Sequence, residues 1–218
     1  MHTIAFLTQK GGAGKSTIAS NIAVMALMEG KRVAIIDLDP SKTLVKWSKA
    51  RGANDILVQH ISFEQLSEAL ARLRSQGVNL TVIDVPGIAS DLLLEAALSA
   101  DLCILPVRPN MFDLWASEET VALLRREEIE FSFLLNQCPP VQQKARVQQS
   151  LNMLEAIGGL VKPMVCSRVD YQDAAAHGLG VIEKNPRGVA AHEMTELWKS
   201  IKSRLKRLHK NNDGRRME

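Results

Sequence analysis

The sequence has few cysteines and no long hydrophobic run. Its three cysteines, Cys103, Cys138 and Cys166, lie far apart, and the chain contains no C-x-x-C pair. That spacing gives no support to a zinc site or an iron–sulfur cluster and is typical of reduced thiols near a cytosolic core. No apolar run approaches the roughly 20 residues that span a bilayer. The first residues lack the basic and apolar regions of a secretory signal, so we expect a cytoplasmic protein.

The charge is unevenly distributed along the chain. The 218 residues suffice for one well-packed domain, which we expect over residues 1–210, with a polar tail at 211–218. The formal net charge is +3, yet residues 199–218 hold eight Lys and Arg against two acids. The remainder is therefore slightly acidic. A basic C-terminal segment indicates a polyanion or an anionic surface as a partner.

Short apolar segments alternate with helical patterns along the chain. We expect strands at 3–7, 32–36, 56–58, 80–83, 102–105, 131–135 and 163–167. Helices are expected at 16–29, 43–49, 63–75, 90–98, 114–126, 143–156, 171–177 and 189–208. Continuous apolar strands that alternate with helices predict an α/β fold with a doubly wound, mostly parallel sheet and helices on both faces. This is the architecture of P-loop NTPases.

A glycine-rich loop follows the first expected strand and opens a helix. It reads Lys10-Gly11-Gly12-Ala13-Gly14-Lys15-Ser16-Thr17. The spacing matches the P-loop pattern G-x-x-x-x-G-K-[ST], except that a lysine replaces the first glycine. Glycines let backbone N–H groups turn toward a triphosphate, and the helix N-terminus adds its positive dipole end. We expect Lys15 to reach the β- and γ-phosphates, Ser16 to bind Mg²⁺ and Thr17 to bind a further phosphate.

The lysine at the start of this loop carries a family resemblance. The loop resembles that of the ParA/MinD superfamily of deviant Walker ATPases, K-G-G-x-G-K-[ST]-[ST], and the chain looks closest to the short ParA partition ATPases. In that family the first lysine reaches across a dimer to the partner's nucleotide, which implies the same role for Lys10 here. The physics agrees, because two facing triphosphates repel and need cations between them. The resemblance extends from Thr3 to about Leu208.

Two acidic segments at strand ends add to the resemblance. Asp37-Leu38-Asp39-Pro40 is similar to the family's D-x-D-P segment. Asp37 matches the acid that orients the attacking water, and Asp39 is expected to help hold Mg²⁺. Asp84 ends the apolar strand expected at 80–83, which is the Walker B pattern, and should hold Mg²⁺ as well.

The resemblance also implies a site for the base. Asn136 follows the strand expected at 131–135, and an Asn at this strand end contacts adenine in the family. Arg168 belongs to a stretch that flanks the base and the dimer edge. We therefore expect ATP and Mg²⁺ as cofactors, with Asn136 and Arg168 beside the base.

The basic C-terminal segment has the pattern of an amphipathic helix. Trp198, Ile201, Leu205 and Leu208 are spaced to lie on one helical face. The candidate contacts to nonspecific DNA are basic residues in or just before this helix: Lys184, Arg187, Lys199, Lys202, Arg204 and Lys206. Such binding is salt-sensitive, since each neutralised phosphate releases counterions. A solvated basic face and a membrane-surface helix are the alternatives.

Together these patterns favour a ParA-like ATPase. In this hypothesis ATP closes a sandwich homodimer that binds nonspecific DNA, and a ParB-like partner stimulates slow hydrolysis and release. The protein would then be nucleoid-associated, and it would segregate DNA or position a cytoplasmic cargo. The first alternative is a MinD-like membrane-cycling regulator. A small-molecule kinase and a metal-cluster carrier of the same superfamily are further alternatives. Lys10 argues against a monomeric kinase, and the missing C-x-x-C pair argues against a carrier.

Overall fold

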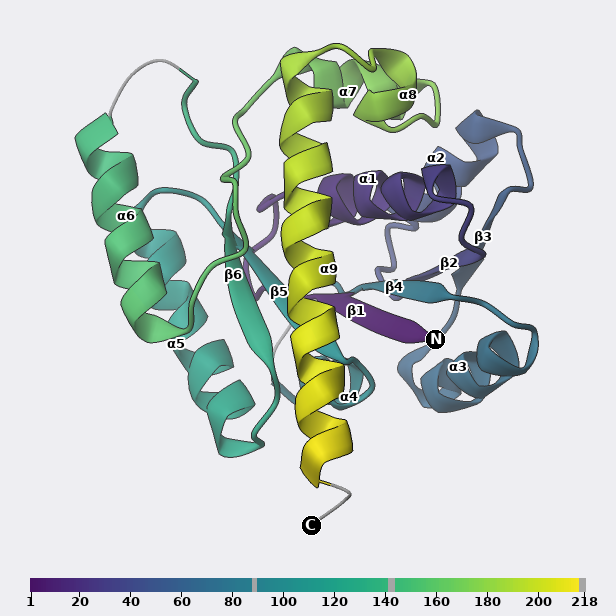
Figure 1. Ribbon diagram of the computed structural model, residues 1–218, viewed down its shortest axis with the longest axis horizontal. Helices are drawn as coiled ribbons and strands as arrows, with labels where there is room; N and C mark the ends of the chain where they lie inside the picture. The colour runs from purple at the N-terminus through teal and green to yellow at the C-terminus, as the bar shows by residue number, and fades with distance from the viewer. Residues whose placement is uncertain (88–89, 141–143, 216–218) are drawn as a thin grey trace.

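A parallel sheet forms the centre of the molecule (Figure 1). The computed structural model describes residues 1–87, 90–140 and 144–215. Within them the sheet has six strands: β1 (His2–Phe6), β2 (Val33–Asp37), β3 (Ile56–His60), β4 (Leu80–Asp84), β5 (Leu102–Val107) and β6 (Phe131–Leu135). Their spatial order is β3-β2-β4-β1-β5-β6, and every neighbouring pair is parallel. The predicted fold class is confirmed.

Helices cover both faces of the sheet. They are α1 (Lys15–Met28), α2 (Thr43–Arg51), α3 (Leu66–Ser75), α4 (Ser90–Leu98), α5 (Met111–Arg126), α6 (Lys144–Ile157), α7 (Val169–Ala176), α8 (Val181–Lys184) and α9 (Val189–Arg215), and a 3₁₀ turn, Phe63–Gln65, precedes α3. Side chains alternate along a strand, so β1 contributes Ile4 and Phe6 to one core and Ala5 to the other, where Leu7 follows directly after the strand. The first core includes α1 and α9, and the second includes α3 to α6.

The prediction of a strand at 163–167 is wrong. The segment beyond α6 runs beside β6 but forms only isolated bridges, Phe133 to Leu160 and Cys138 to Cys166. Backbone hydrogen bonds such as Val165 N to Leu135 O, 2.9 Å, hold it there. Pro163 has no N–H to donate, which interrupts the ladder between these contacts.

Two helices, α5 and α9, extend three or more residues beyond their predicted bounds. α5 begins at Met111, because the Oδ1 atom of Asn110 accepts a hydrogen bond from Asp113 N at 3.0 Å and caps the first turn. α9 continues to Arg215, through part of the segment predicted as a polar tail. Its predicted apolar face is confirmed, since Trp198, Ile201 and Leu205 are buried in the first core.

The register of the central strands places the polar residues. Asp37 on β2 lies opposite Asp84 on β4, and Asp84 lies opposite Phe6 on β1. All three are the last residues of their strands. Because the strands are parallel, their carboxyl ends meet at one edge, directly beside the loop that leaves β1.

Candidate nucleotide site

The glycine-rich loop connects β1 to α1 at this edge. Gly12 and Gly14 have φ values of +78° and +87°, a backbone conformation that L side chains rarely adopt. A Cβ on Gly14 would also collide with the side-chain amide of Asn136. α1 begins at Lys15, so its free N–H groups and its dipole face the loop. The loop has the backbone geometry that a phosphate group requires.

Two amides from the end of β6 hold the loop in place. Asn136 Nδ2 donates to Ala13 O at 2.7 Å, and Gln137 Nε2 donates to Gly12 O at 2.8 Å. Asn136 is buried, and with its nitrogen engaged, its oxygen is the group available to accept a hydrogen bond. The prediction named Asn136 and missed Gln137, for which only its position next to Asn136 was a signal.

Ser16 and Asp84 form the closest polar contact of the site. Ser16 Oγ donates to Asp84 Oδ2 at 2.5 Å. The other carboxyl oxygen, Oδ1, is buried and has no hydrogen-bond partner among the described residues. Burial raises the pKa of Asp84 to about 7. A hydroxyl and a carboxylate with one unsatisfied buried oxygen are ligands of the kind that Mg²⁺ prefers, so these residues fit the expected metal.

Lys15 lies beside these acids. Its side chain is buried, which lowers its pKa, while the charges of Asp84 and Asp39 oppose that effect. The charge of Asp39, the second acid of the D-x-D-P segment, acts on the pKa of both Lys15 and Asp84. An ammonium that is already partly desolvated binds a phosphate strongly, since little hydration remains to be lost.

Asp37 is fully buried, and backbone N–H groups bind its carboxylate. Asp39 N donates to Oδ1 at 3.1 Å, while Leu44 N and Val45 N donate to Oδ2 at 2.9 and 3.3 Å. These contacts cap the N-terminus of α2, which its own N-cap residue Lys42 does not do through its side chain. Burial raises the pKa of Asp37 despite these bonds. The predicted water-orienting acid therefore also anchors a helix.

Lys10 contacts the start of α5. Its Nζ lies 3.6 Å from Asp113 Oδ1 and 5.7 Å from the centre of the Phe112 ring. Asp113 is buried, and Arg108 Nε also donates to it at 2.7 Å. The side chain of Lys10 remains more than one-third exposed, at the rim of the phosphate loop. Sequence reasoning missed Asp113, because nothing local links it to residue 10.

A cavity of about 230 Å³ adjoins the loop on its other side. Gly14 and Thr17 form the wall next to the phosphate site, and Asn136, Arg168 and Tyr171 line the rest together with residues around Cys166. Arg168 directly precedes α7. The structure thus places Asn136 and Arg168, the two residues predicted to lie beside the base, in one cavity next to the phosphate loop.

The chain matches the model of the CobQ/CobB/MinD/ParA nucleotide binding domain over residues 4–190. It belongs to this family. This chain is 26% identical over 210 residues to the maintenance of carboxysome distribution protein A of Halothiobacillus neapolitanus. The match covers 91% of this chain and 95% of that protein. This chain is 28% identical over 130 residues to the protein ParA of Rhizobium radiobacter, covering 59% and 58%.

A solved structure gives the same fold. The MinD cell division protein of Aquifex aeolicus superposes on this chain with a TM-score of 0.76 at 15% identity. The match covers 93% of this chain and 98% of the MinD chain. At this identity the likeness establishes the architecture alone. The chain therefore has the architecture of the MinD/ParA nucleotide-binding fold, with its phosphate loop between β1 and α1.

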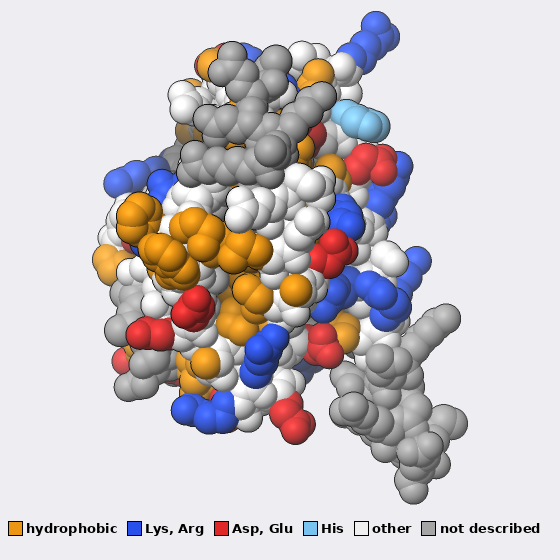
Figure 2. Space-filling model, turned by 90° about the vertical axis from the view of Figure 1, so that its left-hand side faces the viewer, with side chains coloured by type: hydrophobic (Ala, Val, Ile, Leu, Met, Phe, Trp, Pro, Cys, Tyr) orange, Lys and Arg blue, Asp and Glu red, His pale blue; other side chains and the backbone are white. Residues whose placement is uncertain are grey.

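The residues predicted to contact DNA divide into those with a partner inside the chain and those without an ion pair. Lys199 pairs with Glu196 at 2.7 Å, Lys202 pairs with Glu29, and Arg204 donates to Phe131 O at 3.0 Å. Lys184, Arg187 and Lys206 are exposed and form no ion pair with the residues that the structure describes. Along the α9 side of the molecule, basic and acidic side chains alternate (Figure 2).

The unpaired cations are also far apart. Lys184 and Arg187 precede α9, whereas Lys206 lies about 25 Å along the helix from its start at Val189, at 1.5 Å per residue. They do not form one continuous stripe. Within the part of the chain that the structure describes, no helix is both long and apolar enough to cross a bilayer.

Proposed function

We propose that this chain is an ATP-dependent positioning switch of the ParA type. ATP and Mg²⁺ close a homodimer, the dimer binds DNA without sequence preference, and a ParB-like partner stimulates hydrolysis and release. The cargo is a DNA molecule or a cytoplasmic body. The names of two relatives, ParA and a protein for maintaining carboxysome distribution, support such a role.

The contact between Ser16 and Asp84 carries this proposal. Their oxygens, with the unpartnered Oδ1 atom, would hold Mg²⁺, and that ion would neutralise charge on the β- and γ-phosphates. Lys15 would bind the same phosphates from the start of α1, and Thr17 would bind a further one. The oxygen of Asn136 would accept a hydrogen bond from the amino group of adenine, which guanine lacks at that position.

The state of Asp37 accounts for slow hydrolysis. Three backbone N–H groups already bind this carboxylate, one at Oδ1 and two at Oδ2, which leaves one lone pair, on Oδ1, for the attacking water. Asp37 is fully buried, so the segment between Asp37 and α2 must move before the attacking water can reach that lone pair. A partner that binds this segment would therefore accelerate the reaction without adding a catalytic group.

The position of Lys10 supports the proposed role of this lysine across the dimer. Lys10 is the rim cation of the phosphate loop, and its only partner acid among the described residues, Asp113, already has Arg108. Exchanging that shared carboxylate for a partner's triphosphate would lose little and gain a stronger charge interaction.

Binding to a nonspecific DNA duplex tests the switch. The protein is titrated with ATP, with ADP and without nucleotide, at low and moderate salt, while its mass is followed by light scattering. We expect a dimer and salt-sensitive DNA binding with ATP alone. A dimer without DNA binding would remove the DNA step and leave the ATPase assignment. Vesicles of anionic lipid would then test the membrane alternative, although the apolar face of α9 is buried in the core.

A further inference from the structure

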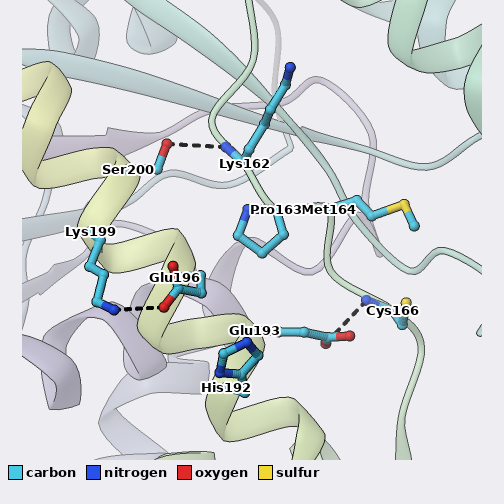
Figure 3. Close-up of a pocket in the computed structure, with 9 residues that line it drawn as sticks. All are labelled: Lys162, Pro163, Met164, Cys166, His192, Glu193, Glu196, Lys199 and Ser200. Atoms are coloured by element: carbon cyan, nitrogen blue, oxygen red, sulfur yellow. Dashed lines mark hydrogen bonds and ion pairs between the residues drawn. The ribbon is translucent and has the colours of Figure 1, made fainter.

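Glu193 connects α9 to the cavity beside the phosphate loop. It lies on α9 and is 8% exposed. On its outer side an open groove of about 700 Å³ runs between α9 and the chain around Pro163. Glu193 is one of the residues that line this groove, and Figure 3 shows its side chain pointing away from the helix toward Cys166. No local sequence pattern predicts a role for this residue.

Three groups that line the cavity beside the phosphate loop bind this one carboxylate. Arg168 donates to Oε1 through Nη2 at 2.7 Å and through Nε at 3.2 Å. The Tyr171 hydroxyl and the Cys166 backbone N–H donate to Oε2 at 3.3 and 3.4 Å. Arg168, Tyr171 and Cys166 all line the cavity next to Gly14 and Thr17. Both oxygens of Glu193 are therefore used to fix the wall of that cavity.

The chemistry of Arg168 makes this arrangement relevant to specificity. A guanidinium has five N–H donors and no acceptor. A donor that points at a purine edge favours the O6 acceptor of guanine over the amino group of adenine. Glu193 accepts hydrogen bonds from two of these five donors, on Nε and Nη2, which fixes the direction of the guanidinium, and its charge neutralises that of Arg168.

We propose that Glu193 is a positioning residue that sets the preference for adenine by holding the donors of Arg168 away from the base. This inference rests on the proposed function, because it concerns the same nucleotide site. Glu193 touches no nucleotide itself. It acts through Arg168 and Tyr171, and it makes the start of α9 part of base recognition.

A neighbouring glutamate provides a matched control. Glu196 lies one helical turn further along α9 and pairs with Lys199 at 2.7 Å. Figure 3 shows this pair on the outer side of the helix, away from Cys166. Glu196→Gln removes the same charge from the same helix without touching the cavity wall. Glu193→Gln keeps the volume but places an amide donor against either Arg168 or the Tyr171–Cys166 donors.

The test measures the affinities of fluorescent ATP and GTP derivatives with Mg²⁺ for the full chain. We expect Glu193→Gln and Glu193→Ala to reduce the preference for ATP over GTP about tenfold, the value of one charge-assisted hydrogen bond. Glu196→Gln should leave the ratio unchanged. The double variant Glu193→Ala/Arg168→Ala should return toward the wild-type ratio, because the released donors are gone. Thermal melting confirms that each variant is folded.

An equal loss of affinity for both nucleotides would show a purely structural residue and overturn the inference alone. An unchanged ratio in a folded Glu193→Gln variant would do the same. A wild-type chain that binds neither nucleotide would overturn the proposed function, and this inference with it.

Discussion

Lys10 and Asp113 are joined by an ion pair of 3.6 Å although more than 100 positions separate them in the sequence. The carboxylate is buried, and it also holds Arg108. In the monomer, the lysine expected to act across a dimer is therefore bound to its own chain. Under the proposed function, dimer closure must break this contact first.

Removing the partner of Lys10 should favour the dimer. The pair is partly exposed, and such pairs contribute about 0–1 kcal/mol, so Asp113→Asn should strengthen ATP-dependent dimerisation about two- to fivefold. Lys10→Ala should abolish the dimer while the monomer still binds ATP. Light scattering and nucleotide titration separate the two effects. Glu118→Gln, an exposed change of the same charge on α5, is the control. A Lys10→Ala variant that dimerises with ATP would remove the role of this lysine in trans.

Asp37→Ala should impair both hydrolysis and folding. The substitution removes the cap of α2, which should lower the free energy of unfolding by about 1–2 kcal/mol. It should also abolish partner-stimulated turnover. Urea unfolding measures the first effect, and phosphate release measures the second. Asp37→Asn keeps one acceptor and should recover part of the stability but no turnover. Normal hydrolysis by Asp37→Ala would show that another group orients the water.

The stability of the nucleotide-free protein should depend on pH through Asp84. Burial raises the pKa of this carboxyl from 3.8 to about 7 in the folded chain. Between these values the unfolded chain has lost the proton that the folded chain retains, so stability falls as pH rises toward 7. Asp84→Asn should therefore raise the melting temperature by several degrees at pH 8 and change it little at pH 4. The same variant should lose any stabilisation by Mg²⁺ and ATP. A shift of equal size at both pH values would contradict the assigned cause.

DNA binding should depend most on the cations that lack an internal partner. Lys184→Ala/Arg187→Ala/Lys206→Ala should weaken ATP-dependent binding more than Lys199→Ala/Lys202→Ala, since the second pair is already neutralised by Glu196 and Glu29. The slope of log affinity against log salt should decrease in magnitude by about 0.9 for each DNA phosphate that the variant no longer neutralises. Titrations at several salt concentrations measure it. Equal effects of the two variants would show that the internal ion pairs open on DNA.

Local patterns predicted the sheet and the phosphate loop well. Glycine spacing, apolar strands and terminal acids are short-range signals, and parallel pairing then brings Ser16 next to Asp84. The contacts of Lys10 with Asp113 and of Arg168 with Glu193 join distant segments, and no local pattern encodes them. The strand predicted at 163–167 failed because apolar content was read without the missing N–H of Pro163. A count of charges along the sequence likewise gave α9 too many unpaired cations. Lys202 and Arg204 pair with Glu29 and Glu130, which lie on distant segments of the chain.

The opposed positions of Asp37 and Asp84 tie the site to correct assembly of the sheet. Side chains on a strand alternate between faces, so a slip of one residue between β2 and β4 would turn one carboxyl away from the phosphate loop. A partly folded or mispaired chain therefore has no complete site. Any nucleotide that binds the finished site stabilises only that arrangement, by mass action. For this protein the cellular ligand would also act as a check on folding quality, selecting chains whose central strands are in register.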